Sequence, residues 1–74
     1  MKNNSTVKLA AIVKPGVAIF GDSMLDLTVK SREAGYNLTV ANIRDAWPCD
    51  ETGGVWVWGA CEDKHYDASG KIDN

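Results

Sequence analysis

The chain has 74 residues, so we expect a single domain (1–74) near the lower size limit for folding without disulfides or metals, and no self-contained enzyme. Its 45% hydrophobic and 24% charged residues are ordinary globular values, which exclude disorder across the body of the chain. Residues 46–74 hold six acidic and two basic groups, against four and six in residues 1–45, so the C-terminal part has the wrong sign for binding phosphates.

The chain begins with two short predicted strands. Residues 6–13 alternate between apolar and polar or small positions, and residues 17–20 form a short apolar run. Pro-Gly at 15–16 suits the two central positions of a tight turn between them. We expect the polar ends, residues 1–5 and 68–74, to be frayed.

A third strand is predicted for residues 24–30. Leu25, Leu27 and Val29 fall on one side of this segment and polar residues on the other, which is the pattern of a half-buried strand. The polar residues 31–35 then interrupt the chain.

Residues 36–43 are compatible with two structures. Their Leu-Thr-Val sequence and β-branched neighbours favour a strand. The alternative is a helix that starts at Asn37 and runs to Trp47, although no clean helical stripe of apolar residues supports it. Both interpretations stay open at this point.

The last part of the chain is again predicted to be strand. Residues 47–54 contain Pro and Gly-Gly and are predicted to be a loop, and residues 55–61 alternate as a strand. Residues 62–66 extend that strand, and residues 71–72 could close the sheet.

These elements predict a mostly-β fold, a small antiparallel barrel or sandwich of five to six strands. The layout is similar to SH3-like barrels in pattern, although no motif identifies a family. The alternative is an α+β domain with one short helix within residues 31–47.

Gly21-Asp22-Ser23 follows an apolar strand, and this arrangement resembles the first block of the SGNH (GDSL) hydrolases. The resemblance implies a doubly wound α/β sheet, with Ser23 as the nucleophile and a histidine base in an Asp-x-x-His arrangement. The histidine here, His65, has an aspartate two residues before it and a glutamate three before it, and the other blocks of the family are missing. We therefore prefer a simple turn at these residues.

Cys49, Cys61 and His65 are the candidate metal ligands. Structural zinc sites usually contain at least one closely spaced pair of ligands, and the spacing here lacks one. We therefore expect no metal and no cofactor, and two free thiols, although a glycine turn between the cysteines leaves their pairing open.

The tryptophans are the most informative candidates for a binding site. Trp56 and Trp58 share one face of a predicted strand whose other face is also apolar, so either one belongs to the core or the pair is exposed as a contact patch. The predicted partner-binding residues are Trp47, Trp56, Trp58, Asp50, Glu51, Glu62 and Asp63.

The chain is therefore interpreted as a non-catalytic protein-binding or regulatory module, with an accessory or inhibitor protein of a mobile element as one hypothesis for its origin. The partner is expected to be a protein. The alternative is a small nucleic-acid-binding barrel that uses basic residues of the first half, namely Lys8, Lys14, Lys30, Arg32 and Arg44. A homodimer through open sheet edges is a further hypothesis. No apolar run reaches the ~20 residues that a membrane span requires, so we expect a cytoplasmic protein without membrane contact.

Overall fold

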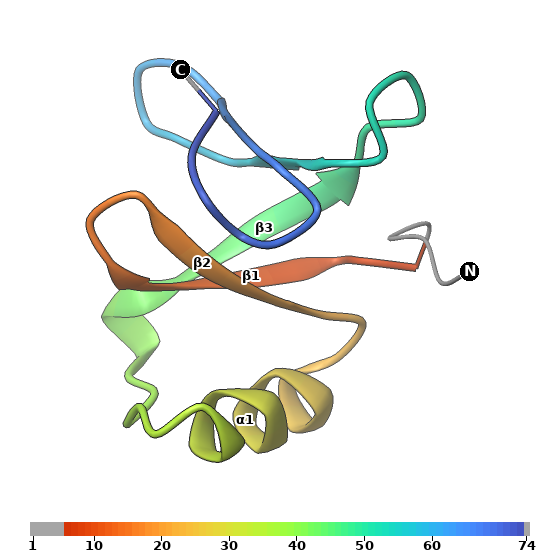
Figure 1. The fold of residues 1–74 in the computed structure, drawn as a ribbon. Coiled ribbons are helices and arrows are strands. Elements are labelled where there is room, and N and C mark those ends of the chain that lie inside the picture. The colour runs from red at the N-terminus through yellow and green to blue at the C-terminus, as the bar shows by residue number, and fades with distance from the viewer. Residues whose placement is uncertain (1–5, 74) are drawn as a thin grey trace.

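The computed structural model describes residues 6–73 and shows five antiparallel strands that curl into a half-barrel, with one short helix (Figure 1). The elements are β1 (Leu9–Lys14), β2 (Val17–Gly21), α1 (Met24–Glu33), a 3-10 turn (Val40–Asn42), β3 (Ile43–Pro48), β4 (Val55–Val57) and β5 (Lys64–Tyr66). The strand order in the sheet is β2-β1-β3-β4-β5. This confirms the prediction of a mostly-β small barrel.

The core lies on the concave side of the curled sheet. It is built mainly from small and β-branched side chains, which allow the strands to curl tightly around it. Partly buried Ile12, Phe20 and Ile72 pack against it. The buried members of this cluster are Val7, Ala10, Ala18, Ala46, Val55, Val57 and Tyr66.

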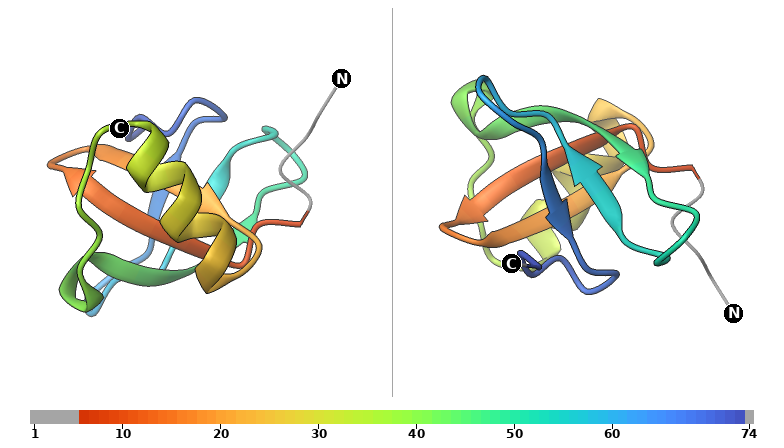
Figure 2. Two further views of the ribbon diagram at one scale, coloured as in Figure 1. Left: turned by 90° about the horizontal axis from the view of Figure 1, so that it is seen from below. Right: turned by 90° about the horizontal axis from the view of Figure 1, so that it is seen from above.

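The helix covers the opposite face of β1 and β2, as the left panel of Figure 2 shows. Leu27 is its fully buried apolar anchor. A side chain at Gly21 would lie 2.9 Å from the backbone nitrogen of Leu27, so only glycine lets α1 approach β2 this closely. Strand alternation places the buried residue Ala11 of β1 on the face opposite Ala10, which is the face that α1 covers. A small side chain at Ala11 therefore leaves room for the helix, as Gly21 does on β2.

The predicted strand at residues 24–30 is wrong, because this segment forms α1. The helix begins at Ser23, whose hydroxyl accepts a hydrogen bond from the backbone NH of Asp26 (3.1 Å). It ends in a Schellman motif, in which the NH of Tyr36 donates to the carbonyl of Ser31 (2.9 Å) and the NH of Gly35 donates to that of Arg32 (2.9 Å). Gly35 supplies the left-handed conformation (φ +88°) that this motif requires.

The helix predicted for residues 37–47 is wrong, and the strand predicted for residues 36–43 lies later in the chain, in β3. Residues 36–39 are irregular, the 3-10 turn follows, and β3 begins only at Ile43. The helix of this fold, α1, overlaps the predicted range 31–47 only at residues 31–33. The amide of Asn42 anchors the connection by donating to the carbonyl of Ile12 on β1 (2.9 Å). At residues 6–73 no helix is long and apolar enough to cross a membrane.

The strands of residues 43–66 differ from the prediction in both length and position. Trp47 and Pro48 belong to β3 rather than to a loop, which reduces the loop to residues 49–54. The strand predicted for 55–61 ends at Val57, and residues 64–66 form a separate strand, β5, that pairs back onto β4.

A C-terminal segment bridges the two edge strands, β2 and β5, as residues 71–72 were predicted to do. Val17 of β2 pairs with Lys71, and Tyr66 of β5 pairs with Ile72. The NH of Ala18 donates to the carbonyl of Gly70 (2.6 Å), and the NH of Ile72 donates to that of Gly16 (2.7 Å). Residues 68–73 are therefore part of the barrel closure, whereas residues 1–5 and Asn74 lie outside the described residues.

Two leucines of α1 provide a matched test of this helix. Leu27 is 0% exposed and Leu25 is 76% exposed, so Leu27→Ala should lower the free energy of unfolding by about 2–5 kcal/mol, whereas Leu25→Ala should change it by less than about 0.5 kcal/mol. Urea unfolding followed by circular dichroism measures both. A strand at 24–30 would place both leucine side chains on one buried face. Equal losses of unfolding free energy in the two variants would therefore contradict the helix.

Asp67 provides a test of the closing segment. Its carboxylate accepts hydrogen bonds from the hydroxyl (2.6 Å) and NH (2.9 Å) of Ser69 and from the NH of Lys71 (3.1 Å), and these bonds, first that of the Ser69 hydroxyl, lower the pKa of Asp67 from its usual 3.8. The stabilisation is therefore complete above the usual value and is lost as the pH falls through the lower folded-state pKa.

We expect the hydrogen-exchange protection factors of the Ala18 and Ile72 amides to fall in that acidic range, and to fall already at neutral pH in Asp67→Asn. The internal control is the amide of Ala46 on β3, which donates to the backbone carbonyl of Lys8 (3.0 Å) and lies away from the closing segment. Unchanged protection of Ala18 and Ile72 in Asp67→Asn would contradict the role given to this carboxylate.

Candidate functional site

Three tryptophans lie on the convex, outward face of the sheet around β3 and β4. Trp47 is 39%, Trp56 36% and Trp58 50% exposed. The intervening residues Val55 and Val57 are buried in the core, so strand alternation turns the tryptophans outward. Neither Trp56 nor Trp58 is a core residue, so the pair is exposed, and its role as a contact patch stays a prediction.

The strand register brings Trp47 directly opposite Trp56, and Trp56 directly opposite His65. A row of three rings therefore crosses β3, β4 and β5 on one face. The ring of Trp56 meets that of His65 edge to face, with centroids 5.0 Å apart and an interplanar angle of 73°. This packing holds the Trp56 side chain in one position while leaving part of it open to solvent.

Trp58 lies at the other end of the outward face. Its NH donates to the carbonyl of Asp45 (2.8 Å), which continues the β3–β4 pairing by one residue. An open hollow of about 380 Å³ lies beside it, and its lining consists of Ile43, Arg44, Asp45, Trp58 and Ala60. We use the name aromatic face for Trp47, Trp56 and Trp58 together.

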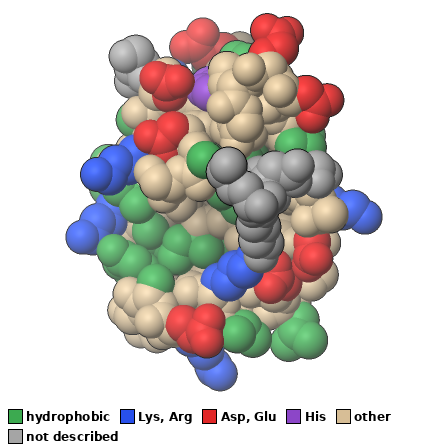
Figure 3. Space-filling view, turned by 45° about the vertical axis from the view of Figure 1, so that its right-hand side comes forward, with side chains coloured by type: hydrophobic (Ala, Val, Ile, Leu, Met, Phe, Trp, Pro, Cys, Tyr) green, Lys and Arg blue, Asp and Glu red, His purple; other side chains and the backbone are tan. Residues whose placement is uncertain are grey.

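The predicted acidic residues bracket the aromatic face at both ends of β4. Asp50 and Glu51 are exposed in the loop before β4, and Glu62 and Asp63 are exposed in the loop after it. Figure 3 shows acidic side chains gathered around the histidine, with the basic side chains around the sides and lower part of that view. The C-terminal part therefore presents a negative rim near an apolar surface.

Not all four carboxylates are equally available. Glu62 forms an ion pair with Lys64 (3.2 Å), and Asp63 accepts a hydrogen bond from the NH of Gly59 (3.3 Å). The more available negative charge therefore lies in the 49–54 loop, at Asp50 and Glu51.

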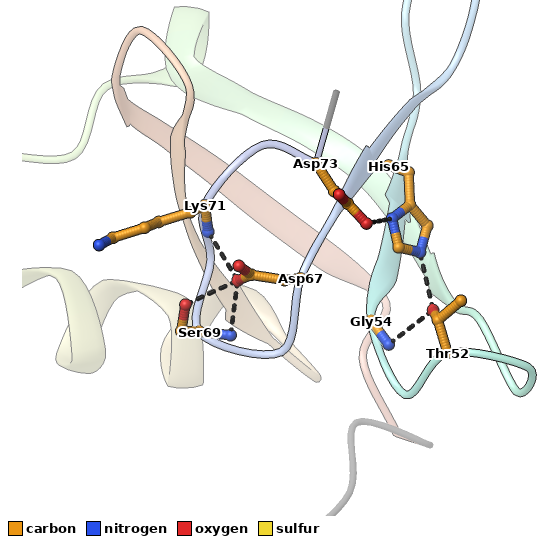
Figure 4. Close-up of polar contacts among 7 residues, drawn as sticks. All are labelled: Thr52, Gly54, His65, Asp67, Ser69, Lys71 and Asp73. Atoms are coloured by element: carbon orange, nitrogen blue, oxygen red, sulfur yellow. Dashed lines mark hydrogen bonds and ion pairs between the residues drawn. The ribbon is translucent and has the colours of Figure 1, made fainter.

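His65 is the site residue whose role the sequence did not indicate. Its Nδ1 lies 3.2 Å from a carboxylate oxygen of Asp73, and its Nε2 lies 2.8 Å from the hydroxyl oxygen of Thr52, which also accepts a hydrogen bond from the NH of Gly54 (3.1 Å; Figure 4). The ring thus links the 49–54 loop, β5 and the C-terminal segment. The sequence indicated His65 only as a candidate metal ligand or catalytic base, and it gave no sign of a contact with Trp56 or Thr52.

The structure also places the residues that were candidates for hydrolase chemistry and for metal binding. The Ser23 hydroxyl caps α1, and the antiparallel sheet differs from the doubly wound sheet that the hydrolase resemblance implies. Cys49 is half-buried and Cys61 is exposed, and both are free thiols. Among residues 6–73, no group of three histidine, cysteine or acidic side chains is arranged to hold a metal ion.

Several of the predicted nucleic-acid-binding cations are already engaged. Lys30 forms an ion pair with Asp26 (3.0 Å), and the Arg44 guanidinium donates to the carbonyls of Ala41 (2.6 Å) and Ile43 (2.9 Å). Lys14 lies over the ring of Tyr36, 5.7 Å from its centroid. These contacts hold the cations on different elements of the fold.

Comparison of the chain with models of known protein families, with curated proteins and with solved structures finds no match.

Proposed function

We propose that the protein is a non-catalytic protein-binding module whose contact surface is the aromatic face. The observation that carries this proposal is the outward exposure of three tryptophans, each by more than a third of its surface, over a core that the same strands already fill. Tryptophans are enriched among the residues that dominate binding energy at protein interfaces. Side chains on paired strands also lose little conformational entropy when a partner covers them.

The charge around the aromatic face supports a partner with a basic rim. Asp50 and Glu51 stand free at one end of it, and the chain from residue 46 onward is acidic overall. Complementary charges speed association and orient the partner, whereas the tryptophans supply most of the affinity. The same acidic surroundings disfavour a nucleic-acid backbone at this face.

The proposal includes the likeness to SH3-like barrels, since such domains use aromatic surfaces to bind extended peptide segments. It also includes a regulatory role, with an accessory or inhibitor protein of a mobile element as the hypothesis for its origin and the cytoplasm as its place of action.

The test compares capture of binding proteins from a lysate by the wild-type chain and by the double variant Trp56→Ala/Trp58→Ala. Loss of one anchoring tryptophan typically weakens binding by ~2 kcal/mol or more, about thirtyfold, so the double variant should retain almost none of the captured protein. Binding to the wild type should also weaken with salt, because the rim contributes charge.

The matched control is Leu25→Ala/Val40→Ala, which removes two apolar side chains that are 76% and 85% exposed on other elements. We expect it to bind like the wild type. Equal capture by the wild type and the tryptophan variant would overturn the proposal. Sedimentation of the same three proteins shows whether the aromatic face instead joins two copies of the chain.

A further inference from the structure

The 49–54 loop folds back on itself and brings Cys49 close to Thr52. The NH of Cys49 donates to the carbonyl of Gly54 (3.0 Å), and the NH of Gly53 donates to the carbonyl of Cys49 (2.9 Å). The turn places the half-buried Cys49 thiol near Thr52 and the ring of His65, which are the groups that act on its pKa. The thiol therefore has polar neighbours from two elements of the fold.

The second part of the arrangement is the orientation of His65. Asp73 lies 3.2 Å from Nδ1, and the Thr52 hydroxyl lies 2.8 Å from Nε2, so both ring nitrogens are held (Figure 4). A side chain at Gly54 would lie 2.9 Å from a ring carbon, so the absent side chain makes room for the imidazole. A thiol, an imidazole and a carboxylate in sequence form the arrangement by which proteins activate a nucleophilic cysteine.

We propose that Cys49 is a nucleophilic thiol that forms mixed disulfides with small-molecule disulfides, with Thr52 and His65 stabilising its thiolate and Asp73 positioning His65. The inference concerns the chemistry of the loop and does not rest on partner binding by the aromatic face.

The electrostatics of the loop agree with this geometry. Hydrogen bonds to the sulfur, first those of the Thr52 hydroxyl and NH and then that of His65, lower the pKa of Cys49 from 9.0 to about 7. The other charged groups nearby are the exposed Asp50 and Glu51 of the same loop and Asp73, which faces His65. About half of the thiol is therefore ionised at neutral pH, where thiols with such values attack disulfides most effectively.

The reaction is an ordinary thiol–disulfide exchange. The Cys49 proton passes to Nε2 of His65, directly or across the Thr52 hydroxyl, and the thiolate attacks one sulfur of a disulfide R–S–S–R. A bond between Cys49 and that sulfur forms as the original S–S bond breaks. Cys49 is oxidised, one R–S group is reduced, and the departing thiolate takes the proton back from His65.

The experiment follows the reaction of oxidised glutathione with Cys61→Ser, in which Cys49 is the remaining thiol, by mass spectrometry from pH 5 to 10. We expect the rate to reach half its maximum near pH 7. At neutral pH Cys49 should react roughly five- to eightfold faster than a thiol of ordinary pKa, because a ~50-fold gain in thiolate is partly offset by lower intrinsic nucleophilicity.

Two further variants in the Cys61→Ser background separate this chemistry from stability. Thr52→Val removes the hydroxyl in an exposed loop, and Asp73→Asn removes the positioning charge on an exposed side chain, so both should retain the circular dichroism spectrum of the parent. Both should move the midpoint of the pH–rate profile upward. Cys49→Ser, which retains the exposed Cys61, is the reference.

The proposal is overturned if Cys49 reacts at neutral pH no faster than Cys61 in Cys49→Ser. It is also overturned if the folded Thr52→Val and Asp73→Asn proteins keep the midpoint of their parent.

Discussion

The structure depends on burying β1 on both faces. Ala10 and Ala11 are both 0% exposed, one against the core and the other on the face that α1 covers. Only small side chains at these adjacent positions allow a helix and a curled sheet to close around the same strand. The strand at the centre of this arrangement pairs with β2 on one side and β3 on the other, so both halves of the sheet depend on it.

The β-strand content of the fold could be predicted from sequence, but the helix could not be placed by apolar periodicity. Only Leu27 and Ser31 of α1 are buried, and one of these is polar, so no helical stripe is present in the sequence. The apolar residues at 25 and 29, which are exposed, produced the false alternation of a strand. The termini were more informative, because Ser23 with Asp26 and the later Gly35 are ordinary cap signals.

The aromatic face was predictable in part. Alternation along residues 55–58 correctly grouped Trp56 with Trp58, but their exposure depends on whether the opposite face fills the core, which the sequence could not decide. Trp47 was assigned to a loop because of Pro48, and proline is tolerated at the end of a strand. The contacts of His65 with Thr52 and Asp73 join three separate segments and depend on tertiary pairing, so local sequence patterns could not indicate them.

The bridge between Gly16–Ala18 and Gly70–Ile72 also affects how the molecule folds. It joins segments from the first and last parts of the described chain, so forming it closes a long loop. The β1–β2 and β4–β5 pairs are local and can form early, whereas this closure has to wait until the strands between them are in place. The same bridge should open first in partial unfolding, which would expose the edges of β2 and β5 before the centre of the sheet separates.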